Sequence, residues 1–111
     1  MRIDIETSDG SLFRALFEGP IEAALADGVV VHLNNAPARE GMDLLPIVSM
    51  TIEVAKHLAP ELAAGVIAHW LYQRLSHRTI ERIRIDQTAI EFDQDAIRKV
   101  VRSSIELERR H

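Results

Sequence analysis

The stretch that decides the fold runs from Met42 to Ser76 and reads MDLLPIVSMTIEVAKHLAPELAAGVIAHWLYQRLS. Its core is the run from Leu62 to Tyr72, eleven consecutive residues without an Asp, Glu, Lys or Arg. An apolar run of this length has to be covered by another element or by another molecule.

In the first half of the segment, apolar residues recur at spacings of three and four, at Ile47, Met50, Val54 and Leu58. This spacing is typical of an amphipathic helix and predicts one over residues 44–58. A proline inside a helix removes a hydrogen bond and clashes with the preceding turn. Pro60 therefore leaves two alternatives: one helix kinked near Ala59, or two helices at 44–58 and 60–76.

The second half is apolar on nearly every side, with small residues between its large apolar ones, Leu62, Val66, Ile67, Trp70 and Leu71. Such a helix is buried in a core, inserted in a membrane or shared with a second copy of the chain. A membrane span needs about twenty apolar residues, and Glu53, Lys56 and Glu61 lie just upstream. We therefore expect a core helix or an oligomer interface, and no membrane association.

Upstream of this segment, residues 2–6 alternate polar and apolar, which predicts a strand. Helical spacing predicts a helix at 9–18, and Gly19-Pro20 predicts its end and the start of a second helix at 20–26. Asp27-Gly28 is a turn signal, and the β-branched residues after it predict a strand over 28–33, in the middle of the sheet. Residues 34–41, NNAPAREG, predict a loop of the kind that often binds partners.

Downstream, the period changes from helical to two. Residues 79–86 and 88–92 are predicted strands of a hairpin that turns at Asp86-Gln87-Thr88. Asp93 predicts the cap of a final helix at 94–108, followed by a frayed tail. We therefore expect a single α+β domain over residues 1–111, with about four short strands in one sheet and five helices packed mainly on one face.

Composition limits the function. The chain has 111 residues and no cysteine, so disulfides, thiolate metal sites and a cysteine nucleophile are excluded. Residues 1–70 carry four basic and ten acidic side chains, which argues against a nucleic-acid grip. Five arginines between 74 and 98 could form only a local patch. No secretory signal is visible at the start, and we expect a cytoplasmic protein.

No catalytic signature is found. The serines include no glycine-flanked elbow, and no glycine-rich turn joins a strand to a helix. Glu53, His57 and Glu61 are spaced four apart, so on one straight helix they would form a stripe of metal ligands. A metal-dependent enzyme using Glu53 and His57 is therefore an alternative, but a solvated helix face is the simpler interpretation. We expect no catalytic residue, no metal site and no cofactor.

Four stretches resemble a bacterial family called the effector-associated constant component. They are SLFRALFEG, the loop APAREGMD, the end HWLYQRL of the apolar segment, and the closing pattern IRIDQTAIEFDQDAIRKVV. The resemblance implies a non-enzymatic adaptor that links effector or sensor components of bacterial conflict systems through protein contacts, and it transfers no catalytic residue. We expect the partner surface to include Pro37, Arg39, Glu40 and Gly41 in the loop, and Trp70, Arg74 and Arg78 around the end of the central helix.

Two other hypotheses stay open at this point. The adaptor could bind a second copy of itself through the apolar helix. A small inhibitor encoded by a phage or mobile element would also be short, acidic and poor in motifs, and its acidic surface would cover a basic site on its target.

Overall fold

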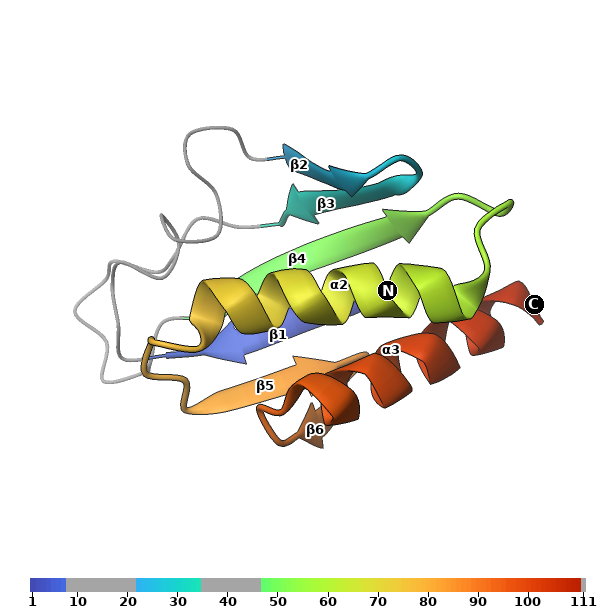
Figure 1. Cartoon of the computed structure of the whole chain (residues 1–111). Helices are drawn as coiled ribbons and strands as arrows, with labels where there is room; N and C mark the ends of the chain where they lie inside the picture. Colours follow the sequence, from blue (N-terminus) through green and yellow to red (C-terminus); the bar gives the residue numbers. More distant parts are fainter. Residues whose placement is uncertain (8–21, 35–46, 111) are drawn as a thin grey trace.

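A six-stranded antiparallel sheet with two helices on one of its faces makes up the part of the chain that the structure describes, residues 1–7, 22–34 and 47–110 (Figure 1). The structure is a computed structural model. The strand order is β2-β3-β4-β1-β5-β6. The strands are β1 (Arg2–Glu6), β2 (Glu22–Ala26), β3 (Val29–Leu33), β4 (Ile47–Val54), β5 (Arg82–Ile85) and β6 (Thr88–Ile90), and the helices are α2 (Pro60–Leu75) and α3 (Gln94–Arg109).

The strand at the start of the chain lies inside the sheet. β1 pairs on one side with β4, where Ile3 lies opposite Met50, and on the other side with β5, where Ile3 lies opposite Ile85. Both partners come from distant parts of the sequence. The sheet is therefore complete only when the start of the chain lies between residues 47–54 and residues 82–85.

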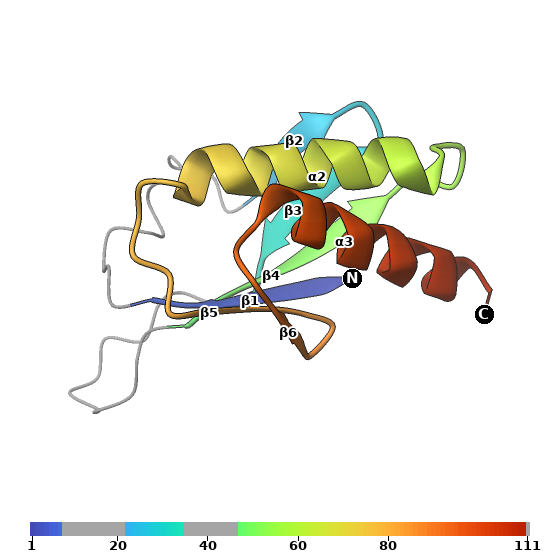
Figure 2. The same cartoon turned by 60° about the horizontal axis from the view of Figure 1, so that its bottom comes forward.

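One face of the sheet is apolar because side chains alternate along each strand. The fully buried residues of the strands that share this face are Ile3, Ile5, Val29, Val31, Val48, Met50, Ile52, Ile83 and Ile85. Both helices cover this face, and they run antiparallel to each other (Figures 1 and 2). α3 contributes Ile97, Val101 and Ile105, and α2 contributes Ala63, Ala64, Ile67, Ala68, Leu71 and Leu75.

Several predictions from the sequence are confirmed. The helices predicted at 60–76 and 94–108 and the strands at 2–6 and 28–33 are present, and β3 lies inside the sheet. The predicted hairpin turns at Asp86 and Gln87, both in the left-handed backbone region that two-residue hairpins use. Its strands, β5 and β6, are shorter than the predicted 79–86 and 88–92. The helix predicted at 9–18 lies outside the described residues.

The helix predicted at 44–58 is wrong, because residues 47–54 form β4. Its side chains alternate: Val48, Met50 and Ile52 are buried, while Glu53 on the opposite face is exposed. Apolar residues lie so densely here that both a period of two and a period near 3.6 can be found. The high share of β-branched residues in IVSMTIEV is the signal that favours a strand.

The helix predicted at 20–26 is also wrong, because residues 22–26 form β2. Alanine favours helices, but the turn at Asp27-Gly28 returns the chain on itself and pairs β2 with β3. Gly28 has a φ of 93°, a backbone conformation that suits glycine. Pairing between neighbouring strands here overrides local propensity, and the sheet has six strands where about four were expected.

The alternatives for Pro60 are also settled. α2 begins at Pro60 itself, where the missing N–H costs nothing, and Ala59 before it is extended, with φ −65° and ψ 136°. There is neither one kinked helix nor a pair of helices in this segment, but a strand, a turn and a helix. Among the helices of the described residues, none has both the length and the apolar character that crossing a membrane requires.

Candidate functional site

The residues predicted to bind a partner lie in two places. Pro37, Arg39, Glu40 and Gly41 are outside the described residues. The other three follow each other around the C-terminal end of α2: Trp70 is half-buried against the core, Arg74 is exposed on the helix, and Arg78 is exposed in the turn after it. Each of these three takes part in an interaction within the chain.

The proposed metal stripe is not formed, because its residues do not share a helix. Glu53 is on β4, His57 is in the turn after β4, and Glu61 is in the first turn of α2. The Glu53 carboxylate instead lies 3.4 Å from His32 Nε2 on the neighbouring strand. Within residues 1–7, 22–34 and 47–110, no three His, Asp or Glu side chains form a group that could hold a metal.

The five arginines between 74 and 98 do not form one patch. Arg82 and Arg84 are on β5, on the face of the sheet opposite the helices, whereas Arg74 and Arg98 are on the helices. Arg84 lies 3.2 Å from the Glu6 carboxylate on the adjacent strand. The basic side chains are therefore distributed over both faces of the molecule.

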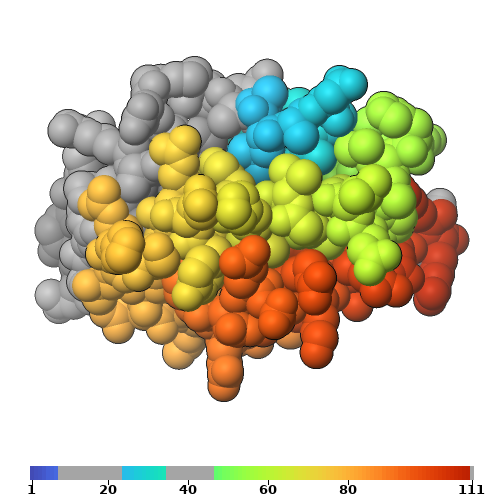
Figure 3. Space-filling model, in the orientation of Figure 1, coloured from blue at the N-terminus to red at the C-terminus, as the bar shows by residue number. Residues whose placement is uncertain are grey.

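The side of α2 turned away from the sheet carries no Asp, Glu, Lys or Arg between Leu62 and Tyr72. We call this surface the α2 outer face and define it by Leu62, Gly65, Val66, His69 and Tyr72, which lie opposite the buried positions on the helix. Leu62 is 67% exposed and Tyr72 is 38% exposed. In the space-filling view α2 crosses the middle of the visible face, next to α3 (Figure 3).

α3 differs from α2 in that its outer side is charged. Arg98 lies 3.5 Å from Asp95, and Arg102 donates a 2.9 Å hydrogen bond to Glu106. That hydrogen bond, together with the charge of Glu106 and of Glu61, holds the pKa of Arg102 above its usual range. α3 is thus an ordinary surface helix with a polar side and an apolar side, whereas α2 carries charges only near its ends, at Glu61 and Arg74, and none between Leu62 and Tyr72.

Gly65 is a second unusual feature of α2. A methyl group built there would meet no atom of residues 1–7, 22–34 and 47–110 within 4 Å, so packing among these residues does not require a glycine. In a helix interior glycine is less favourable than alanine by about 1 kcal/mol. The chain therefore carries a destabilising residue in the middle of the α2 outer face, and packing within the described part of the chain does not explain it.

Tyr72, at the border of this face, is held in place by an aromatic neighbour. Its ring stacks on Phe92 with 5.3 Å between the ring centroids and 14° between the planes. Phe92 precedes α3, so the stack connects the two helices. A tyrosine held in this way presents a fixed ring edge at the surface, at low entropic cost for binding.

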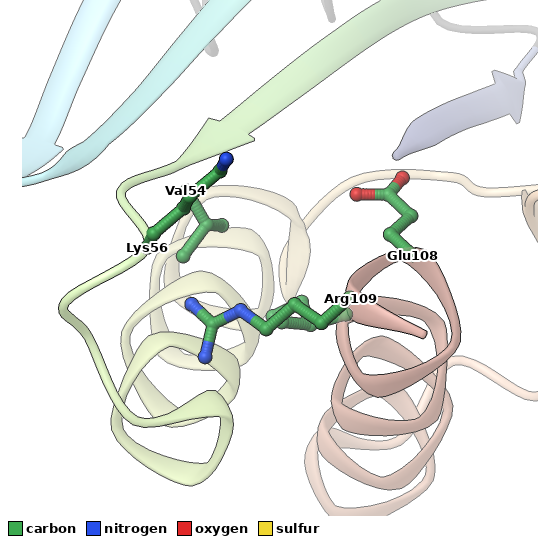
Figure 4. A pocket seen from close by; sticks show the side chains of 5 residues that line it. Val54, Lys56, Glu108 and Arg109 are labelled. Atoms are coloured by element: carbon green, nitrogen blue, oxygen red, sulfur yellow. The ribbon is translucent and has the colours of Figure 1, made fainter. Parts of the chain in front are cut away.

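A cleft lies at the opposite end of the helix pair, between the end of β4 and the last turns of α3 (Figure 4). Its volume is about 390 Å³, and it is lined by Val54, Lys56, Ile105, Glu108 and Arg109. Arg109 reaches across it and donates a 3.0 Å hydrogen bond to the carbonyl oxygen of Ala55. The Glu108 carboxylate lies 2.6 Å from the α-amino nitrogen of Met1.

Sequence reasoning named the apolar helix as a possible contact with a second copy but did not predict which of its residues are exposed, and it did not predict the cleft. Leu62 was expected to be buried, and its position opposite the six buried residues of α2 is visible only once the sheet side of the helix is known. The cleft residues come from segments that the sequence suggested were a helix and a frayed tail. No local pattern connects them, because the two elements meet only in the folded molecule.

Comparison with known proteins finds no matching family model, no matching curated protein and no matching solved structure.

Proposed function

We propose that this chain is a non-enzymatic adaptor domain that binds a protein component, an effector or a sensor, of a bacterial conflict system, and that the α2 outer face contacts the partner. The assignment to conflict systems draws on the family resemblance. The contact surface draws on the structure of α2.

The observation that carries the proposal is the exposed, uncharged side of α2. A surface helix normally places charged residues toward water, as α3 does. Leu62 on α2 is instead exposed over 67% of its surface, and the ten residues that follow it carry no charge. Covering such a side chain with a partner gains roughly 25 cal/mol for each Å² of apolar surface removed from water.

Gly65 adds a second argument for the same surface. A side chain there would not clash with any described residue of the chain, which suits a glycine that is present for contact with a partner. A glycine on a helix surface lets the backbone of another element approach closely. The partner is therefore expected to place a helix or strand across α2 at Gly65, with Leu62 and His69 on either side.

The test begins with cross-linking in the native host. A photoreactive amino acid replaces Leu62 in one strain and Ser103 in another, since Ser103 is an exposed residue on α3 away from the α2 outer face. One protein should be captured from position 62 and not from position 103. That protein is then purified, and its affinity for the chain is measured by calorimetry.

Variants then test whether the affinity for the captured protein depends on the α2 outer face. Leu62→Lys and Gly65→Ala should each weaken binding about tenfold or more, while Ser103→Lys, which adds the same charge elsewhere, should leave it unchanged. All three variants should remain folded, because these positions lie outside the core. Equal affinities for Leu62→Lys and Ser103→Lys would reject the α2 outer face as the contact.

The same experiment separates the remaining hypotheses. Capture of a second copy of the chain from position 62 would assign the surface to self-association. Capture of a host enzyme that the chain inhibits would favour the inhibitor hypothesis over the adaptor.

A further inference from the structure

The cleft between β4 and α3 has the composition of a binding site for a small organic anion. Its volume of about 390 Å³ lies within the usual range of small-molecule sites, which combine apolar walls with a few polar groups. Here the apolar walls are Val54, which is half-buried, and Ile105, which is only 3% exposed. They could cover a short aliphatic group.

The charges around the cleft are not balanced. Among the described residues that line it, Glu108 is the one carboxylate; it lies 2.6 Å from the α-amino nitrogen of Met1 and is already matched by that positive charge. Lys56 and Arg109 are the other two charged residues of the lining, and both are basic. The cleft therefore has a surplus of positive charge, next to an apolar wall.

Arg109 is oriented by the fold. Its Nη2 donates to the Ala55 carbonyl oxygen at 3.0 Å, which draws the side chain from α3 across to the turn after β4 (Figure 4). A guanidinium has five N–H donors in a planar fork, so this hydrogen bond leaves donors to spare for a carboxylate. Lys56 comes from the same turn as Ala55 and brings a second cation to the rim of the cleft.

We propose that this cleft binds a small carboxylate with a short aliphatic chain, its carboxylate on Arg109 and Lys56 and its aliphatic chain against Val54 and Ile105. The lining of this site shares no residue with the α2 outer face, and the inference does not depend on the protein-binding proposal. Arg109 at the end of α3 also interacts favourably with the helix dipole, which by itself would produce no binding.

Calorimetric titration of the full chain with hexanoate tests the inference. We expect saturable binding at one site per chain, while hexanol, which has the aliphatic chain and no carboxylate, and acetate, which has the carboxylate and no chain, should each bind at least about tenfold more weakly. Inorganic phosphate as a fourth probe separates simple anion attraction from recognition of both parts. Phosphate binding as tight as that of hexanoate would overturn the assignment of an aliphatic acid.

Matched variants locate the site. Arg109→Gln should weaken hexanoate binding about tenfold or more, because a hydrogen bond to a charged group contributes about this much. Arg110→Gln removes the same charge one residue along, outside the cleft lining, and should change the affinity less than twofold. Melting temperatures of both variants check that the fold is intact.

If hexanoate does not bind, or if Arg109→Gln and Arg110→Gln lower its affinity equally, the cleft is not the site and Arg109 serves only to close the end of α3. If only Arg109→Gln and Lys56→Gln lower it, the site is established.

Discussion

Ala64 and Gly65 are neighbours on α2 with opposite environments. Ala64 is fully buried against the sheet, whereas a methyl group on Gly65 would meet no atom within 4 Å. Small side chains at 63, 64 and 68 are among the buried residues of α2, and the element that lies closest to the α2 backbone is α3. Residue size at these positions therefore limits how closely α2 packs in the core.

Enlarging these two residues should have opposite effects. Ala64→Leu forces extra volume into a packed core and should lower the free energy of unfolding by about 1–3 kcal/mol. Gly65→Ala should raise it by about 0.5–1 kcal/mol, since alanine is the better helix former and finds open space. Urea unfolding measures both. A destabilising Gly65→Ala would mean that something within the chain already approaches this glycine.

Gln87 occupies a backbone conformation that costs it energy. Its φ is 70°, in the left-handed region, and it follows Asp86 with φ 48° in the hairpin turn. Gln87→Gly should stabilise the protein by about 0.5–1 kcal/mol, because Asp-Gly is a preferred pair for this turn. Gln87→Val should destabilise it, and a thermal melt of the two variants would show shifts in opposite directions.

At the scale of elements, the two helices begin differently. In α3 the Asp93 carboxylate accepts a 3.0 Å hydrogen bond from the Ala96 amide, which caps the first turn. α2 begins after Ala59, whose side chain makes no capping hydrogen bond. The N-terminus of α3 is therefore capped by a neighbouring side chain, whereas the N-terminus of α2 depends more on packing against the core.

Changes at the two caps should differ in sign. Asp93→Ala should cost about 0.5–2 kcal/mol of stability, while Asp93→Asn, which keeps an acceptor, should cost little. Ala59→Ser should add about 0.5–1 kcal/mol, since Ala59 already has the extended backbone of a capping residue. Chemical denaturation measures each change. No gain from Ala59→Ser, with Ala59→Val as the control, would show that the start of α2 is already satisfied.

At the scale of the whole molecule, one core joins all the described elements. β1 is paired with β4 and β5, and both helices bury their inner sides on the same face of the sheet. Contacts between such distant parts of a sequence form late and are lost together. The described elements therefore have no part that could unfold alone with its core intact.

This arrangement predicts cooperative unfolding. The fluorescence of Trp70, the only tryptophan, and the far-ultraviolet circular dichroism of the whole chain should follow the same curve in urea, with the same midpoint. Trp70 packs against the core from α2, and so it reports on the contact between the helix and the sheet. Two separate midpoints would mean that the helices detach from the sheet before the sheet unfolds.

The sequence by itself determined the elements whose signal is local. α3 has one apolar line and a capping Asp93, the hairpin has alternating strands around Asp86-Gln87, and α2 combines Pro60 with a long apolar run. Each of these patterns is complete within about fifteen residues. Neighbouring side chains and backbone hydrogen bonds are enough to favour these elements, and their type was predicted correctly, although the hairpin strands are shorter than predicted.

Only the tertiary structure decided the rest. β2 and β4 are strands because β3 and β1 lie beside them, although their own residues also fit a helix. The exposure of Leu62 likewise depends on how α2 packs on the sheet. Lys56 and Arg109 line one cleft only because α3 packs beside the end of β4. Strand pairing and the packing of helices on the sheet bring together residues that are far apart in the chain. The local sequence pattern does not indicate which of these residues will be in contact.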